Sequence, residues 1–343
     1  MSCQNKILLI YTGGTIGMEK KPGSDILVPF DFANIQDRIP ELKLIEKEID
    51  SVSFEQPLDS SNIRPKHWQQ IAQIIFDKYE DYAGFVILHG SDTMAYTASA
   101  LSFMLENLSK PVILTGSQLP IGDLRTDAKE NIITSIEIAG AYENGKPIVP
   151  EVAIYFEFKL LRGNRTTKFS TDDFNAFHSP NYNPLATSGV YLKYYKHRIL
   201  PPSSGIFDIH KTMVDKVFTL KIHPALRQEH LEYFLDMPDL KALILETYGA
   251  GNALTEDWFL TALKKAIDTK NMKIINISQC IKGSISPYKY ETGKKLMELG
   301  AINGKDLTLE AALTKTMYLL SKNLSYPAFK KAFERPIRGE MTE

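Results

Sequence analysis

The 343-residue chain is poor in cysteine and in long apolar runs. Its two cysteines, Cys3 and Cys280, make no disulfide framework, which favours a reducing compartment. The first apolar run, Ile7–Ile10, is followed at once by polar residues. No run reaches the roughly 7–15 apolar residues of a secretory signal or the about 20 of a membrane span. The sequence therefore predicts a soluble, cytoplasmic protein with no membrane partner.

Excess charge and metal-binding spacings are also missing. The chain has 40 Lys and Arg against 41 Asp and Glu, a net charge of -1, and no basic block. Binding to a nucleic-acid backbone is therefore not expected. The seven histidines are dispersed, and no His-x-x-x-His or Cys-x-x-Cys pair occurs, so a metal site is not indicated.

Short apolar runs alternate with amphipathic stretches through the first half of the chain. The runs suit buried strands and are Lys6–Tyr11, Gly84–Leu88, Pro111–Thr115 and Val152–Phe156. Helical periodicity lies between them, in His67–Tyr79, after Asp92 and in Asp127–Ala141. This alternation predicts an α/β fold with a doubly wound, mostly parallel sheet.

A cluster of turn residues divides the chain. Tyr182–Ile206 is rich in Pro, Ser, Gly and Asn, and the predicted linker covers residues 196–216. Strand and helix patterns resume beyond it, with strands expected at Ala242–Leu245 and Lys273–Ile277. We expect a catalytic α/β domain at 1–195 and a second, smaller α/β domain at 217–343.

The residues that follow the first strands are the candidates for a binding site. Ligands of open parallel sheets bind beyond the carboxyl ends of the strands. Small, hydroxylated or charged residues stand there, in Thr12–Gly17, His89–Thr93 and Gly116–Gln118. The first loop matches neither a Walker loop nor Gly-x-Gly-x-x-Gly, but two glycines beside two threonines could present amide N–H groups to an anion.

Each of the other signals has two interpretations. Ser91 and Asp92 could carry chemistry or merely cap the helix that follows. The basic cluster Arg162–Lys168 could be a solvated face, or Lys168 could act as a proton acceptor beside a hydroxyl. His89 lies beside the candidate loop and is more simply structural than catalytic.

Two long motifs together resemble the signatures of bacterial-type L-asparaginases, in particular the cytoplasmic type I enzymes. They are Tyr11–Met18, with the sequence YTGGTIGM, and Leu88–Thr97, with the sequence LHGSDTMAYT. Further matching segments are Thr115–Gln118, Arg162–Lys168, Tyr248–Asn252 and Arg338–Glu340. The resemblance therefore spans nearly the whole chain.

The resemblance implies an amidohydrolase that converts L-asparagine to L-aspartate and ammonia without metal or cofactor. It places the nucleophile at Thr15 and a second hydroxyl–carboxylate–lysine set at Ser91, Asp92 and Lys168. The substrate would be held by Gly14, Asp59, Ser60, Ser61, Ser91 and Asp92. An amide needs both an activated nucleophile and preorganised donors, and backbone N–H groups around Gly14 and Ser91 are candidates for an oxyanion hole.

Two departures from the family pattern concern the active site. Ser91 stands where the family usually has Thr; because the hydroxyl remains, we expect activity to be retained. The family lid often carries an activating Tyr, whereas Met18–Phe30 has none. Tyr11, or a tyrosine from a neighbouring subunit, is an alternative partner for Thr15. The Glu19–Pro29 stretch still has the composition of a lid.

A third departure concerns regulation. Some type I members bind asparagine at an allosteric site, to which Thr167 and Cys280 would correspond here. Glu246 replaces the arginine expected there, and an acid cannot pair with a substrate carboxylate. We therefore expect weak or absent activation by asparagine.

Family members usually form homodimers or homotetramers, with Asn252 a candidate for reaching a neighbour's site. One alternative is a glutaminase-asparaginase, because an enzyme discriminates one methylene by only about 1–3 kcal/mol. A second is an amidotransferase subunit, which normally carries an extra N-terminal domain. A third is a non-catalytic amino-acid sensor that kept the pocket.

Overall fold

The computed structural model describes residues 6–20, 27–29, 35, 39–286 and 291–343. Its contacts divide the chain into two compact units, Met1–Lys211 and Thr212–Glu343. No helix within the described ranges is long and apolar enough to cross a membrane. Cys3 and residues 21–26 of the predicted lid, Glu19–Pro29, lie outside the described residues.

The first unit is built on an eight-stranded sheet of order β15-β14-β11-β10-β7-β5-β1-β4. Five neighbouring strands are parallel: β4 (Glu48–Leu58), β1 (Lys6–Gly13), β5 (Gly84–Leu88), β7 (Val112–Thr115) and β10 (Val152–Phe156). Antiparallel strands extend one edge: β11 (Lys159–Arg162), β14 (Ala186–Thr187) and β15 (Lys193–Tyr194). Each predicted apolar run is therefore a strand of this sheet.

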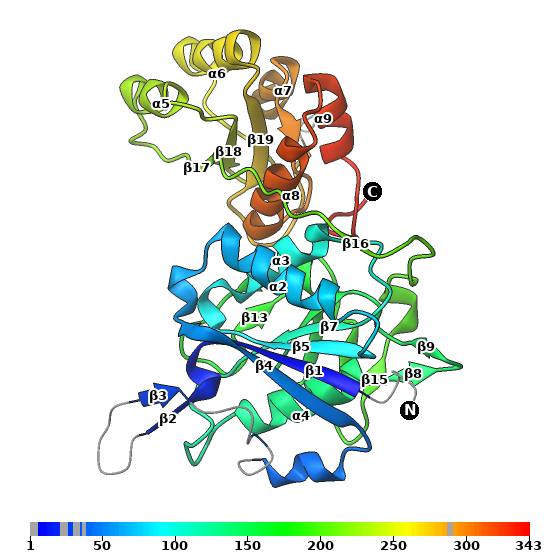
Figure 1. Cartoon of the computed structure of the whole chain (residues 1–343). Helices are drawn as coiled ribbons and strands as arrows, with labels where there is room; N and C mark the ends of the chain where they lie inside the picture. Colours follow the sequence, from blue (N-terminus) through cyan, green and yellow to red (C-terminus); the bar gives the residue numbers. More distant parts are fainter. Residues whose placement is uncertain (1–5, 21–26, 30–34, 36–38, 287–290) are drawn as a thin grey trace. The chain divides into compact units, whose positions relative to one another are not determined.

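Helices cover both faces of that sheet. The helices α2 (Pro65–Asp77) and α3 (Met94–Met104) lie on one face and α4 (Ala128–Ala139) on the other (Figure 1). Ile7 and Leu9 of β1 pack in the core cluster that contains α4, and the alternate residues Leu8 and Ile10 are also buried. Burial of successive residues explains the continuous apolar runs, since neither face of these strands meets water.

Short elements complete the first unit. The hairpin β2 (Met18–Lys20) and β3 (Leu27–Pro29) follows the first loop, and β8 (Tyr142–Glu143) pairs with β9 (Lys146–Pro147). Residues after 196 still pack here, because β16 (Asp208–Ile209) pairs with β6 (Leu105–Glu106). The boundary at Lys211 falls inside the range 196–216 that the turn residues indicate as a linker.

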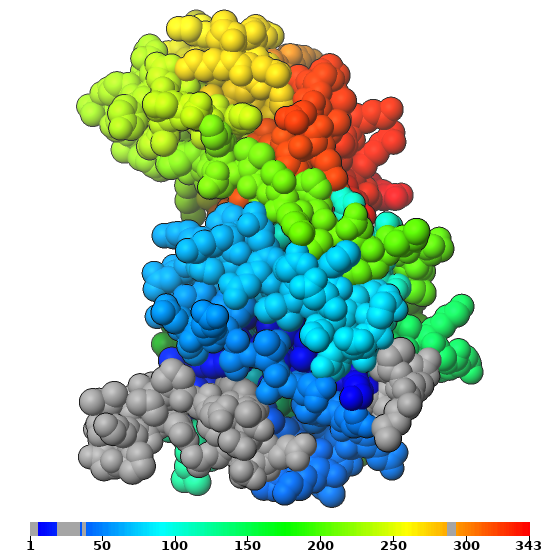
Figure 2. Space-filling view, viewed as in Figure 1, coloured from blue at the N-terminus to red at the C-terminus, as the bar shows by residue number. Residues whose placement is uncertain are grey.

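The second unit is a smaller α/β layer structure. Its sheet is fully parallel, in the order β17 (Val217–Lys221), β18 (Ala242–Thr247), β19 (Lys273–Ser278) and β20 (Ile302–Asn303). The helices are α5 (Gln228–Leu235), α6 (Asp257–Lys270), α7 (Glu291–Glu298), α8 (Leu309–Ser321) and α9 (Tyr326–Phe333). On the face seen in Figure 2, its surface is formed by α5 and α6 (yellow-green and yellow) and by the red C-terminal segment. The predicted α/β class, with a mostly parallel sheet and a smaller second α/β domain, is confirmed.

Candidate active site

The carboxyl ends of β1 and β5 bring two loops into backbone contact. The strands pair in parallel, with Tyr11 opposite Leu88. Gly14 has φ 91°, and a Cβ there would lie 2.5 Å from the N and Cα atoms of Gly90. A Cβ on Gly90 would in turn lie 2.6 Å from the Ser60 hydroxyl oxygen. Only glycine fits this contact, so both glycines are needed for close approach rather than for a turn alone.

Lys168 joins the second loop to a strand far along the chain. It lies on β12 (Thr167–Lys168), which pairs with β13 (Phe177–His178). Its Nζ donates to Ser91 Oγ at 2.9 Å and to Asp92 Oδ1 at 2.7 Å. The side chains of Lys168 and Asp92 are 18% and 62% exposed, so the ion pair is open to solvent on one side.

These contacts bear on the structural interpretations of Ser91, Asp92 and the basic cluster. Gly90 is the N-cap of the 3-10 turn Ser91–Thr93, and Thr93, the N-cap of α3, makes no capping bond with its side chain. Capping therefore does not account for Ser91 and Asp92. Arg162 and Arg165 are only 4% and 3% exposed, so the basic cluster is not a solvated face.

The Asp59–Ser61 segment lies against the same loop. Asp59 Oδ1 accepts the Ser61 N–H at 2.9 Å and caps the turn Ser60–Asn62. This hydrogen bonding holds the pKa of the Asp59 carboxyl below its ordinary value. The Ser60 carbonyl accepts from the Thr93 hydroxyl at 2.7 Å, which fixes the segment beside Gly90.

Thr15 begins the turn Thr15–Gly17 and is half-buried. Tyr11, on β1, donates from its hydroxyl to the Gly17 carbonyl at 3.2 Å. Burial raises the pKa of Tyr11 to about 12, so the phenol stays protonated near neutral pH. Tyr11 is therefore suited to hold the loop in place and poorly suited to be the base for Thr15.

His89 belongs to a buried chain of hydrogen bonds. Its ring is 1% exposed, with Nδ1 at 2.7 Å from the Gly90 carbonyl and Nε2 at 2.9 Å from Thr97 Oγ1. Trp68 Nε1 donates to the same hydroxyl at 3.0 Å. Burial lowers the pKa of His89 to about 4, so the ring is neutral and donates from Nδ1. His89 supports the loop and is not placed to transfer protons.

Asp127 and Asn131, which no sequence motif indicated, hold the loop after β7. Asp127 accepts the N–H groups of Gln118 and Leu119, and Asn131 Nδ2 donates to the Gly116 carbonyl at 3.0 Å. Gln118 Nε2 reaches the carbonyls of Thr171 and Asp173 at 3.0 and 2.9 Å. A buried Asn within an apolar helix pattern is a usable signal, because such an amide requires partners.

The other predicted residues are Glu246, Asn252 and Cys280, which belong to the second unit, and Thr167, which adjoins Lys168 on β12. Glu246 is on β18 and Cys280 follows β19, and Gln279 Nε2 donates to the Glu246 carbonyl at 2.7 Å. Asn252 forms a bridge with Tyr248 in the loop after β18. Thr167, on β12, belongs to the first unit. Within the described residues, no group of three His, Cys, Asp or Glu side chains could hold a metal ion.

Comparison with known proteins identifies the class to which this fold and site belong. The family described as "Asparaginase, N-terminal" matches residues 6–200, and "Glutaminase/Asparaginase C-terminal domain" matches residues 216–333. The chain belongs to the asparaginase family of amidohydrolases.

Full-length relatives sharpen that assignment. The chain is 41% identical over 340 residues to L-asparaginase 1 of Escherichia coli K12, covering 99% of this chain and 98% of that protein. The crystal structure of L-asparaginase I from Vibrio cholerae matches with 38% identity, a TM-score of 0.88 and 99% coverage of both chains. L-asparaginase from Thermococcus kodakarensis matches with 30% identity, a TM-score of 0.90 and 98% and 99% coverage. The family resemblance of the motifs is confirmed.

Proposed function

We propose that the protein is an L-asparaginase that hydrolyses the side-chain amide of L-asparagine, with Thr15 as nucleophile and without a metal ion. The observation that carries the proposal is the position of the Lys168 ammonium. It contacts the Ser91 hydroxyl and the Asp92 carboxylate in the loop whose Gly90 touches Gly14, next to Thr15.

The proposed reaction has two displacements. Thr15 Oγ attacks the amide carbon, its proton passes to the leaving nitrogen, and ammonia departs from a Thr15 ester. Water then adds to the ester carbonyl, which releases aspartate and restores the hydroxyl. Backbone N–H groups around Gly14 and Ser91 would stabilise the oxyanion in both steps. Neither step requires a Lewis acid if these donors are preorganised.

Charge explains how the substrate would be oriented. Asp92 is exposed and has one carboxylate oxygen beyond the one that Lys168 contacts, so it can take the substrate ammonium. Asp59, Ser60 and Ser61 belong to the segment that lies against Gly90 and Thr93, and we propose that they bind the α-amino and α-carboxyl groups. Lys168 is proposed to accept or relay the proton of the hydroxyl that it contacts.

Ammonia release from asparagine by the purified chain tests this proposal. Thr15→Ala should lower turnover on the order of 10⁴–10⁶-fold, the scale on which hydrolases lose activity with their nucleophile. The matched control, Thr15→Ser, keeps the hydroxyl and should retain measurable turnover. Full activity of Thr15→Ala would remove Thr15 from the mechanism. Equal turnover of glutamine would indicate a glutaminase-asparaginase, and binding without turnover would indicate a sensor.

Assembly, location and regulation complete the proposal. We propose a cytoplasmic homodimer or homotetramer in which Asn252 contacts a neighbour's site, a location that the cysteine content supports. Sedimentation gives the oligomeric state directly.

Activation by asparagine should be weak because Glu246 cannot pair with a carboxylate. A sigmoidal rate curve that is abolished by altering Thr167 or Cys280 would contradict this.

A further inference from the structure

A basic cavity lies within the second unit, at the end of β20. It has a volume of about 670 Å³ and is lined by Met297, Asn303, Lys305, Pro327, Lys330, Lys331, Glu334 and Arg335. Its lining carries four cations and one carboxylate, in a chain whose net charge is -1. The volume is within the usual range for small-molecule sites, roughly 300–1,000 Å³. All of these residues lie beyond Thr212, whereas the Lys168 cluster lies in the first unit.

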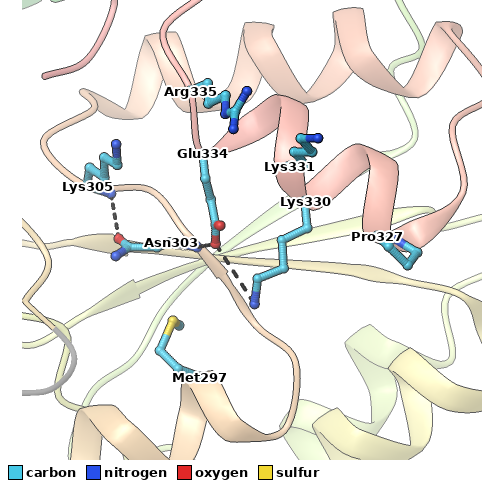
Figure 3. Close-up of a pocket in the computed structure, with 8 residues that line it drawn as sticks. All are labelled: Met297, Asn303, Lys305, Pro327, Lys330, Lys331, Glu334 and Arg335. Atoms are coloured by element: carbon cyan, nitrogen blue, oxygen red, sulfur yellow. Dashed lines mark hydrogen bonds and ion pairs between the residues drawn. The ribbon is translucent and has the colours of Figure 1, made fainter. Parts of the chain in front are cut away.

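Two of the charged groups are already used by the fold. Lys330 donates to the Ala301 carbonyl at 2.7 Å and lies 3.9 Å from a Glu334 carboxylate oxygen. That carboxylate accepts the Asn303 N–H at 2.9 Å. Figure 3 shows these three residues converging at the end of β20. Lys330 and Glu334 therefore offset one another and leave the cavity strongly positive.

The other three cations are not neutralised. Among the residues that the structure describes, the side chains of Lys331 and Arg335 make no ion pair or hydrogen bond, and no dashed line reaches them in Figure 3. Lys305 Nζ has only a 3.3 Å contact with the Thr342 carbonyl. The Lys305 backbone is held at φ 50° by the Asn303 side chain, which accepts its N–H at 2.8 Å. The cavity therefore combines three available cations with an apolar wall of Met297 and Pro327.

A second cavity, lined in part by Lys241, Lys270 and Lys273, contains a lysine that is hydrogen-bonded by the protein itself. Lys273 is 4% exposed, yet its Nζ donates to the Asn271 backbone and side-chain oxygens at 2.9 and 3.0 Å. It also lies 4.7 Å from the Tyr326 ring centroid. Those contacts account for Lys273 without a ligand, whereas Lys331 and Arg335 are exposed and make no such contacts with the described residues, so an anion can reach them.

We propose that the β20 cavity binds a small polyphosphate anion. Arg335 can form a bidentate contact with one phosphate, and Lys305 and Lys331 can act as point charges on others. A nucleoside triphosphate and a free polyphosphate both present the phosphate chain that these cations would recognise. The wall of Met297 and Pro327 could in addition hold the apolar part of a nucleotide. This site is independent of the proposed asparaginase reaction.

Titration calorimetry on the full chain at low salt tests the proposal, with tripolyphosphate as the probe. The charge reversal Lys331→Glu with Arg335→Glu should weaken binding at least about tenfold, because charge-assisted contacts dominate such sites. The matched control is Lys264→Glu with Lys265→Glu on α6, which changes the total charge equally and should alter affinity by less than about threefold. If the reversed variant does not fold, Lys331→Gln with Arg335→Gln replaces it.

Two outcomes would overturn the proposal: no saturable binding of tripolyphosphate by the wild-type chain, or equal weakening in both charge-reversed pairs, which would show only general attraction. Comparison of the affinities for ATP, tripolyphosphate and adenosine distinguishes a nucleotide ligand from a free polyphosphate. Tighter binding of ATP than of tripolyphosphate supports a nucleotide against the apolar wall. Equal affinity supports recognition of the phosphate chain alone. Adenosine binding as tightly as ATP contradicts a phosphate site.

Discussion

Two lysine–carboxylate pairs, one in each unit, have the same chemistry and opposite surroundings. Lys168 and Asp92 are 18% and 62% exposed, with nitrogen and oxygen 2.7 Å apart. Lys315 and Glu340 are both fully buried, 2.5 Å apart. Lys315 also donates to the Arg335 carbonyl, and Glu340 accepts the backbone N–H groups of Ile337 and Arg338.

The two pairs differ in how many of their hydrogen-bonding atoms have no partner, which is their spare bonding capacity. Every oxygen and most hydrogens of the Lys315–Glu340 pair are used to hold the C-terminal segment on α8. In the described structure, Lys168 has a third ammonium hydrogen and Asp92 a second oxygen with no partner. A charged pair that is incomplete and open to water can bind a zwitterion, whereas a complete and buried pair can only stabilise the fold.

Removal of the Lys168 charge should have the largest effect. Lys168→Met is expected to lower turnover of asparagine by about 10³-fold, within the usual range for loss of an acid–base group. The free energy of unfolding should change little, because Asp92, the charge left without its partner, is 62% exposed and stays solvated. Lys159→Met is the matched control, at a lysine of the same unit whose Nζ donates to Asn175 Oδ1. Turnover of Lys168→Met within threefold of wild type would show that the open pair has no catalytic role.

The buried pair should show the reverse pattern. Lys315→Met leaves Glu340 charged and buried, which should cost about 3–5 kcal/mol of stability. Each unit contains one tryptophan, Trp68 or Trp258. Fluorescence of Trp258 in a Trp68→Phe background therefore reports denaturant unfolding of the second unit.

Glu340→Gln is the companion variant, since it keeps an acceptor for the Ile337 and Arg338 N–H groups while it removes the charge. Molecules that remain folded should retain turnover per site. A loss below about 1 kcal/mol for Lys315→Met would place this pair with ordinary surface pairs.

The sequence predicted the open site far better than the closed pair. Thr12–Gly17 and His89–Thr93 were recognisable because strand ends and glycines have positional meaning in parallel sheets. The role proposed for Lys168 depended on the family resemblance, because its contact with Ser91 joins residues 77 positions apart. Lys315 gave no signal: a lysine in an amphipathic helix is ordinarily exposed, and its partner lies 25 positions later, in a segment without helical or strand periodicity.

His89 lies between these extremes, as a buried group that supports the open site. Its pKa is about 4 in the folded protein and 6.5 when unperturbed, so unfolding takes up a proton below pH 6.5. Its contribution to stability is complete above pH 6.5 and is lost as the pH falls towards 4. Between pH 7 and 4.5 this loss should be about 2–3 kcal/mol.

His89→Gln checks that window, since glutamine does not titrate. Unfolding of the first unit, followed by Trp68 in a Trp258→Phe background, should become less sensitive to acid than in wild type. Parallel pH curves for the two proteins would mean that His89 is not the group that takes up the proton.

The smallest effect belongs to a pair that is exposed on both sides. Lys264 and Asp268 lie one turn apart on α6, 2.7 Å from each other, with side chains 53% and 52% exposed. Solvent screens such a pair, and Lys before Asp is the less favourable order along a helix, so Lys264→Ala should cost less than about 0.5 kcal/mol. Trp258 on the same helix reports the measurement. If Lys264→Ala lowers the free energy of unfolding by more than about 1 kcal/mol, exposure does not determine how much a lysine–carboxylate pair stabilises this protein. Spare bonding capacity alone would then distinguish the Lys168 site.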